Sequence, residues 1–203
     1  MGGRRLILIP QRPGSIESEG KRVGKPRSRF RSAPKLRESQ YHFGVDTLAR
    51  NKDVHWTLEL VGDGPLRREI EQLTAQLGLL DRVQFTGTRR DVPERLAKAQ
   101  ILALISRWEG FPLTVIEGMR AGLPTIGSDV GGVREAVEDG QNGFLVPRED
   151  PEELSRKVRI LLTDAQLRRR MGQEGRRRYE SMFTFEKMYE RTLEVYKQAM
   201  LTR

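Results

Sequence analysis

The stretch ILALISRWEGFPLTVIEGMRAGLPTIG, residues 101–127, predicts a strand, a loop, a helix and a second strand in succession. Residues 101–105 form an unbroken apolar run, which is typical of a strand buried on both faces of a parallel sheet. A turn at residues 110–112 follows, and the next apolar run predicts a helix. The Gly-Leu-Pro sequence at 122–124 ends this helix, and residues 125–127 form the next strand.

Two carboxylates, Glu109 and Glu117, lie eight positions apart within this stretch. The spacing places Glu109 in the loop before the helix and Glu117 on the first or second helical turn. A helix N-terminus carries free backbone N–H groups and a partial positive charge, which favour phosphate, and carboxylates beside it can accept hydrogen bonds from sugar hydroxyls. The pattern suggests a site for a nucleotide-linked sugar. A solvated loop acid and an acid that is favourable to the helix dipole would occupy the same two positions.

The rest of the chain repeats this alternation of strands and helices. Further strands are predicted at residues 6–9, 55–61, 83–86 and 144–146, and further helices at 43–51, 66–77, 92–99, 133–137 and from 151 onward. Such alternation predicts an α/β fold with a doubly wound parallel sheet of the Rossmann-like type, followed by C-terminal helices.

Glycine-rich turns follow three of the predicted strands. They contain Gly62 and Gly64, then Gly87, and then Gly110. In open α/β sheets, ligands bind beyond the carboxyl ends of the strands, and these ends share one edge of the sheet. We therefore expect the three turns to lie near one another at a ligand-binding edge.

Charge is distributed unevenly along the chain, whose net charge is +9. Residues 1–50 hold 12 Lys and Arg against 4 Asp and Glu, whereas residues 51–203 hold 25 against 24. Residues 10–40 show little periodicity and are rich in Arg, Ser, Gly, Pro and Lys. We predict a basic, poorly ordered leader at 1–42 and a Rossmann-like domain at 43–203. The leader would bind polyanions through charge alone, without a specific nucleic-acid site.

The composition excludes several classes of site. Cysteine is absent and there are two histidines, His42 and His55, so disulfides and thiolate metal sites are ruled out. A Ser-His-Asp triad and a His-rich metal site receive no support. The absence of cysteine suits a reducing compartment, and no apolar run approaches the roughly 20 residues that span a bilayer. We expect a cytoplasmic protein.

Three groups of motifs carry more specific information. They are VGDGP at 61–65, FTG at 85–87 followed by DV at 91–92, and SRWEGFPLTVIEGMRAGLPTIGSDVGGVREAVEDGQNGFLVP at 106–147. Together they resemble the C-terminal, donor-binding domain of the family-four retaining glycosyltransferases. The most specific part is the E-x7-E pair, with GFP after the first acid and GLP beyond the second.

The resemblance implies one half of the two-domain GT-B architecture. It also implies retaining transfer from a nucleotide-diphosphate sugar, in polysaccharide or glycolipid biosynthesis, without a metal or another cofactor. It assigns Glu109 to the transferred sugar at the reaction centre, as the catalytic residue, and Glu117 to the ribose hydroxyls. The other donor-binding residues that it implies are Gly62, Gly64, Arg89, Arg90, Gly110, Phe111, Leu113 and Thr114.

Two features depart from that family. Its members usually carry an Arg and a Lys, roughly GR-x4-KG, that clamp the diphosphate, and residues 10–45 hold no clean match. The N-terminal acceptor domain also has no counterpart in the 203 residues. We therefore predict a donor-binding half that is incomplete alone. The alternative is a non-catalytic partner subunit or nucleotide-binding module that completes a separate acceptor-domain chain.

Two Arg triplets, at 168–170 and 176–178, fall on the predicted C-terminal helices. Triplets spread around a helix rather than along one face, which favours a solvated surface. The alternative is a membrane-facing patch that makes a peripheral contact at the inner membrane face, because many relatives act on lipid-linked acceptors.

Overall fold

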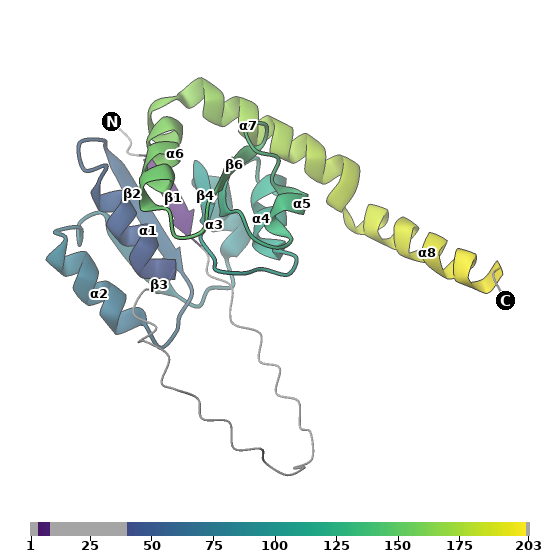
Figure 1. Cartoon of the computed structure of the whole chain (residues 1–203), viewed down its shortest axis with the longest axis horizontal. Coiled ribbons are helices and arrows are strands. Elements are labelled where there is room, and N and C mark those ends of the chain that lie inside the picture. Colours follow the sequence, from purple (N-terminus) through teal and green to yellow (C-terminus); the bar gives the residue numbers. More distant parts are fainter. Residues whose placement is uncertain (1–3, 9–39, 202–203) are drawn as a thin grey trace, which may run out of the picture.

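The computed structural model describes residues 4–8 and 40–201, and the side chains of 4–8 and 44–201. Within these residues, six parallel strands form one sheet in the order β3-β2-β1-β4-β5-β6 (Figure 1). The strands are β1 Arg4–Leu8, β2 Trp56–Val61, β3 Val83–Gly87, β4 Ile101–Leu104, β5 Thr125–Ser128 and β6 Gly143–Val146. This order is that of a doubly wound Rossmann-like sheet, as the alternation of elements predicts.

Helices connect the strands and continue beyond the last one. They are α1 Gln40–Ala49, α2 Arg67–Gln76, α3 Val92–Lys98, α4 Leu113–Arg120, α5 Val133–Ala136, α6 Pro151–Thr163, α7 Ala165–Arg178 and α8 Phe185–Leu201, with a π-helical turn η1, Tyr179–Phe183, between the last two. Every element expected between residues 55 and 146 is present, with ends that differ by a few residues at most.

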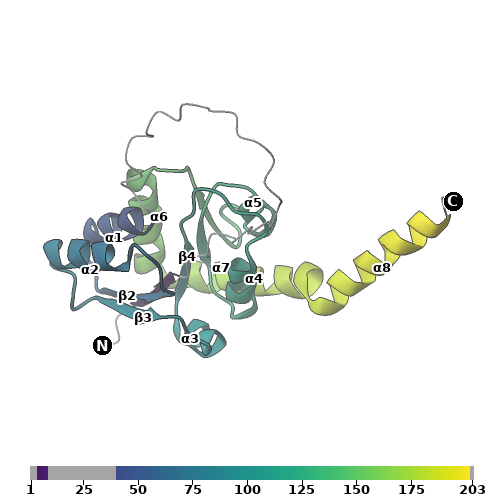
Figure 2. The same ribbon diagram turned by 90° about the horizontal axis from the view of Figure 1, so that it is seen from below.

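Helices cover both faces of the sheet. Apolar side chains of α1, α2 and α6 share one core cluster with Leu6 and Leu8, whereas α3 packs with Ile7 on the opposite face. Figure 2 shows α1 and α6 on one side of the strands and α3 on the other. Because successive side chains of a strand point to opposite faces, the part of a strand that is covered on both faces must be apolar at every position, as all of β4 and residues 6–8 of β1 are.

Strand β1 corrects the expected domain boundary. Residues 1–42 were predicted to form a leader outside the domain, but Arg4–Leu8 pairs with β2 on one side and β4 on the other. This strand therefore lies in the middle of the sheet. Its pairing partners lie about 50 and 95 positions further along the chain, as the register Leu6 with Leu58 and Leu6 with Ile101 shows. Of the rest of the predicted leader, residues 40–42 begin α1, whereas residues 1–3 and 9–39 are outside the described residues.

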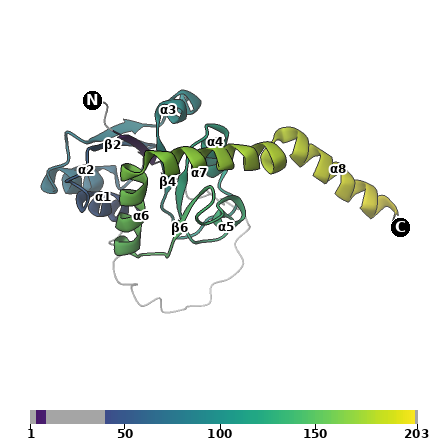
Figure 3. The same ribbon diagram turned by 90° about the horizontal axis from the view of Figure 1, so that it is seen from above.

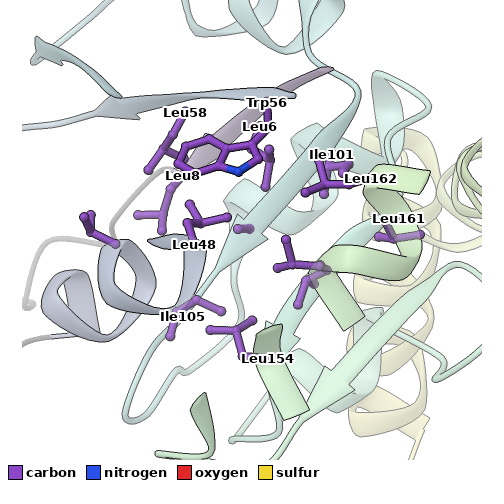
Figure 4. Packing of buried hydrophobic residues seen from close by; sticks show 14 of the residues in the cluster. Leu6, Leu8, Leu48, Trp56, Leu58, Ile101, Ile105, Leu154, Leu161 and Leu162 are labelled. Atoms are coloured by element: carbon purple, nitrogen blue, oxygen red, sulfur yellow. The ribbon is translucent and has the colours of Figure 1, made fainter. Parts of the chain in front are cut away.

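The core beneath α1 is built around Trp56. Its side chain is fully buried, and its Nε1–H donates to the backbone oxygen of Asn51 at 2.9 Å. Figure 4 shows the indole ring among Leu6, Leu8 and Leu58. A buried indole that keeps a hydrogen-bond partner contributes its full apolar area without the cost of an unpaired N–H group.

Helix α8 is unlike the other long helices. It leaves the body of the domain after η1 and extends away from the sheet (Figures 1 and 3), and none of its residues is buried. Among the described residues, no helix is long and apolar enough to cross a membrane.

Candidate functional site

The loop between β4 and α4, residues 105–112, contains Glu109 and is called the acid loop below. It lies at the carboxyl edge of the sheet, where the chain order reverses between β1 and β4. In doubly wound sheets the connections on either side of such a reversal diverge to opposite faces and leave a crevice that binds ligands. The topology therefore places the acid loop at the position in this fold where a ligand site is expected.

Glu109 is held through its side chain. The hydroxyl of Ser106 donates to Oε1 of Glu109 at 2.5 Å, and the backbone N–H of Ser106 donates to Oγ of Ser128 at 3.0 Å. Both serines are buried, with exposed fractions of 4% and 3%. Burial raises the pKa of Glu109 above its ordinary value, and the hydrogen bond from Ser106 opposes that rise because it favours the ionised form.

Glu109 is also held through its backbone. The N–H of Gly132 lies 3.3 Å from the carbonyl oxygen of Glu109 and 2.8 Å from that of Gly110. A Cβ atom at Gly131 would lie 1.8 Å from the oxygen of Glu109, and one at Gly132 would lie 2.0 Å from the oxygen of Gly110. The turn between β5 and α5 can approach the acid loop this closely only because both positions are glycine.

The turn between β6 and α6 contacts the acid loop from a further direction. Glu149 pairs with Arg107 at 3.2 Å, and the guanidinium of Arg148 donates to the backbone oxygen of Arg107 at 3.4 Å. Glu149 has φ 62°, and it is the one described residue other than glycine with a positive φ. That backbone geometry costs roughly 1 kcal/mol, so the carboxylate reaches Arg107 from a mildly strained position.

Glu117 lies on the second turn of α4, which begins at Leu113 and has no side-chain cap on its N-terminus. Much of its side chain is exposed, yet the neighbouring protein removes enough water to raise its pKa, while Arg120 acts in the opposite direction. A Cβ atom at Gly118 would lie 2.4 Å from Cδ2 of Leu102, so α4 packs closely on β4. The helix that carries Glu117 is therefore fixed against the sheet.

Large apolar side chains surround the start of α4. Trp108 is 73% exposed, and Phe111 and Leu113 are also exposed, whereas Thr114 is buried. The ring of Phe111 lies 5.7 Å from that of Phe183 in η1, centroid to centroid. The side chain of Phe111 thus packs toward the C-terminal helices, and its backbone remains at the helix mouth.

The glycine turns after β2 and β3 meet each other. Gly62 donates its N–H to the oxygen of Gly87 at 2.9 Å, and Gly62 has φ 143°. Gly64 lies in an open position in the same turn. One strand, β1, separates β2 from β4, so these turns lie about 10 Å or more along the edge from the acid loop. The structure thus places all three predicted turns on one edge.

Arg89 and Arg90 follow β3 at that edge and are exposed. Arg89 forms two hydrogen bonds with Asp91, at 2.8 and 3.2 Å, and Arg95 pairs with both Asp91 and the buried Glu59. The hydrogen bond from Arg89 holds the pKa of Asp91 far below its ordinary value. The guanidinium of Arg89 is thus engaged by Asp91, in a chain of ion pairs that continues through Arg95 to Glu59.

The two Arg triplets interact with the domain itself. Arg168 donates to backbone oxygens at the end of α6, Arg176 donates to that of Arg120, and Arg178 donates to that of Glu135. Among the described residues, no group of three or more His, Cys, Asp or Glu side chains could hold a metal ion.

Comparison with known proteins defines the class. The fold is that of one Rossmann-like half of a GT-B glycosyltransferase, and it superposes on the C-terminal domain of the group 1 glycosyl transferase LpcC from Francisella tularensis with a TM-score of 0.69 at 21% identity, covering 90% of this chain and 87% of that one. The family of glycosyl transferases group 1 matches residues 40–178. The chain belongs to this family.

Two longer relatives show what share of their own length this chain matches. N-acetyl-alpha-D-glucosaminyl L-malate synthase of Bacillus anthracis is 36% identical over 144 residues, which make up 71% of this chain and 38% of the synthase. The Anabaena protein HepE, solved in complex with UDP, superposes with a TM-score of 0.76 at 23% identity, over 97% of this chain and 49% of its own. The chain spans about half of such relatives or less.

Sequence reasoning missed the residues that hold Glu109 in place. Ser106 and Ser128 are 22 positions apart, and no local pattern joins them. The one available signal was their placement, since each follows or ends a strand at the carboxyl edge. The expected diphosphate clamp falls within residues 10–45, most of which are outside the described residues.

Proposed function

We propose that this chain binds a nucleotide-diphosphate sugar as the donor half of a retaining glycosyltransferase. The observation that carries the proposal is the acid loop, which holds a hydrogen-bonded Glu109 at the strand-order reversal, beside the N-terminus of α4. Membership of the group 1 family supports it. So does the likeness to HepE, whose solved structures include complexes with UDP and with UDP-glucose.

The chemistry follows from the arrangement. Backbone N–H groups at Leu113 and Thr114 would face the diphosphate, which the α4 dipole favours. Glu117 would accept hydrogen bonds from the ribose, and Glu109 would lie against the transferred sugar, where a carboxylate stabilises developing positive charge. Gly62 and Gly64 would allow the backbone to approach the nucleotide, with Arg89 and Arg90 near its base. No metal enters this scheme.

Calorimetric titration of the folded chain with UDP, GDP and ADP tests the donor site. At least one nucleotide should bind, and Glu117→Ala should weaken it about ten- to a hundred-fold, which is the loss of one or two charged hydrogen bonds. The binding of a sugar phosphate without ribose should not change in Glu117→Ala. Glu194→Ala, on the exposed polar side of α8, is the matched control. Absence of binding to all three nucleotides would remove the proposal.

A specific observation also favours the second candidate function, in which the chain completes another domain. The apolar residues of α8 recur at helical spacing and remain exposed: Phe185, Met188, Tyr189, Leu193, Val195, Tyr196, Met200 and Leu201. Exposed apolar faces of this extent usually mark an interface. HepE matches 97% of this chain and has another half of similar length. We propose that α8 docks on a domain equivalent to that other half, which would be an acceptor domain.

Sedimentation of the chain alone and with the complementary half of the Bacillus anthracis synthase tests this docking. We expect a monomer alone and a one-to-one complex in the mixture, lost in Tyr196→Glu and kept in the polar-face control Glu194→Lys. A homodimer that Tyr196→Glu dissociates would show instead that a second copy covers α8.

A further inference from the structure

We propose that Ser106 and Ser128 are positioning residues for Glu109, and that the turn between β5 and α5 is therefore a structural part of the donor site. The assignment of Glu109 to the donor sugar rests on the proposed function. The positioning itself rests on contacts within the chain.

A continuous path of hydrogen bonds joins β5 to the Glu109 carboxylate. Ser128 is the last residue of β5, and its Oγ accepts the backbone N–H of Ser106 at 3.0 Å. Ser106 in turn donates its hydroxyl to Glu109 Oε1 at 2.5 Å. Both serines are almost fully buried, so their polar atoms depend on protein partners rather than water. The first bond sets the backbone of the acid loop, and the second sets the orientation of the carboxylate.

The same turn also fixes the main chain on the other side of Glu109. The Gly132 N–H lies within hydrogen-bonding distance of the oxygens of Glu109 and Gly110, and any side chain at Gly131 or Gly132 would collide with them. Residues 128–132 therefore support both the side chain of Glu109, through Ser106, and its backbone, through Gly132. A carboxylate that must face a reacting sugar needs such support, because small errors in placement are costly to the rate.

The hydroxyl of Ser106 has a second effect on Glu109. A neutral carboxyl group is favoured by burial, whereas a donated hydrogen bond favours the carboxylate. The ionised form accepts stronger hydrogen bonds than the neutral form, and only its negative charge can oppose positive charge on a sugar. Ser106 thus maintains both the orientation and the charge of Glu109, and loss of the hydroxyl should alter both.

Carbon-13 NMR titration of the glutamate carboxyls in the nucleotide-free chain tests the positioning. In Ser106→Ala, the pKa of Glu109 should rise by about one pH unit, as expected for the loss of a hydrogen bond to a charged group. Glu117, whose pKa is also raised by burial but which Ser106 does not contact, is the internal control and should not change. Ser106→Thr, which keeps the hydroxyl, should restore the original value.

Ser128→Ala provides a second variant if Ser106→Ala does not fold. It removes the acceptor for the Ser106 N–H and should raise the pKa of Glu109 by a smaller amount. An unchanged pKa of Glu109 in both folded variants would overturn the proposal. Equal shifts at Glu109 and Glu117 would also overturn it, because they would report general loosening of the fold.

Binding measurements separate this proposal from the donor function. Ser106→Ala should weaken the binding of UDP-glucose several-fold and leave the binding of UDP unchanged, because Glu109 would contact only the sugar. A pKa shift at Glu109 in a chain that binds no nucleotide would keep the positioning and remove the donor site. Nucleotide binding with no pKa shift would keep the donor site and remove the positioning.

Discussion

The body of the domain and helix α8 use similar apolar residues in opposite ways. In the body, Trp56 is fully buried beneath α1, whereas Tyr196 and Met200 of α8 are largely exposed. The acid loop also exposes an aromatic side chain, Trp108, but its backbone is tied to two neighbouring turns. Helix α8 continues from η1 with no buried residue of its own.

This difference shows that exposure alone does not define a function. An exposed residue on a fixed loop can form part of a preorganised site, because the scaffold has already set its position. An exposed apolar face on a projecting helix is instead removed from water only when a second surface packs against it. We therefore propose that a ligand binds at the carboxyl edge and that association occurs through α8.

The largest expected effect contrasts the two regions directly. Trp56→Ala should lower the free energy of unfolding by about 4 kcal/mol, because it empties a closed core site. Tyr196→Ala should change it by less than about 0.5 kcal/mol, because Tyr196 is 66% exposed. Urea denaturation of both variants measures the contrast, and a comparable loss from Tyr196→Ala would show that α8 packs on the body.

Gly132→Ala should have the next largest effect. The added Cβ collides with the backbone oxygen of Gly110, so we expect a loss of about 3 kcal/mol of stability together with loss of sugar-nucleotide binding. Gly140→Ala is the matched turn control: it has φ 78° but open space, and should cost only about 1 kcal/mol. Similar losses in both variants would mean that the close approach to the acid loop is unimportant.

A smaller effect depends on pH. Glu117 has a raised pKa in the folded chain, so its ionised form is disfavoured there relative to the unfolded chain. The protonated form of Glu117 does not lower the stability of the folded chain. The free energy of unfolding therefore decreases as the pH rises through the pKa that Glu117 has in the folded chain. Glu117→Gln should accordingly raise the melting temperature slightly at pH 7. At pH 3.5 the melting temperatures of Glu117→Gln and the unmodified chain should be equal. A higher melting temperature of the variant at that pH would contradict the raised pKa of Glu117.

The smallest effect should come from removing α8. Deletion of residues 185–203 takes away no buried side chain of α8, so the free energy of unfolding should stay within about 0.5 kcal/mol of the full chain. Binding of the complementary domain should be lost at the same time. A destabilisation above about 2 kcal/mol would show that α8 supports the body.

Much of the fold could be predicted from local pattern. The apolar runs of β4 and β6 and the periodic spacing of α2 follow directly from residue order, because helix and strand periods are local properties. Strand β1 was predicted as an element and yet placed outside the domain. Its partners, β2 and β4, lie far along the chain, and the basic segment after it differs in composition from the rest.

The candidate site could likewise be predicted only in part from the sequence. Residues Glu109 and Glu117 and the glycine turns were predicted from motif and strand order, and the structure places them along one edge. Their roles toward a nucleotide sugar remain predictions. The contacts of Ser128 and Gly132 with the acid loop could not be predicted, because each joins segments about 20 positions apart. The contact between Ser106 and Glu109 spans only three positions, and the local sequence pattern was not interpreted in that way.

The alternation of elements, the acid pair and the family resemblance could be predicted from the sequence, since all of these depend on the order of residues along the chain. The same order predicted which edge of the sheet would bind a ligand. The packing of distant segments placed β1 at the centre of the sheet and tied two neighbouring turns to the acid loop. It also left α8 projecting from the domain with no buried residue. These properties depend on which distant segments pack together, and packing depends on the shape and burial of the whole domain rather than on any local pattern.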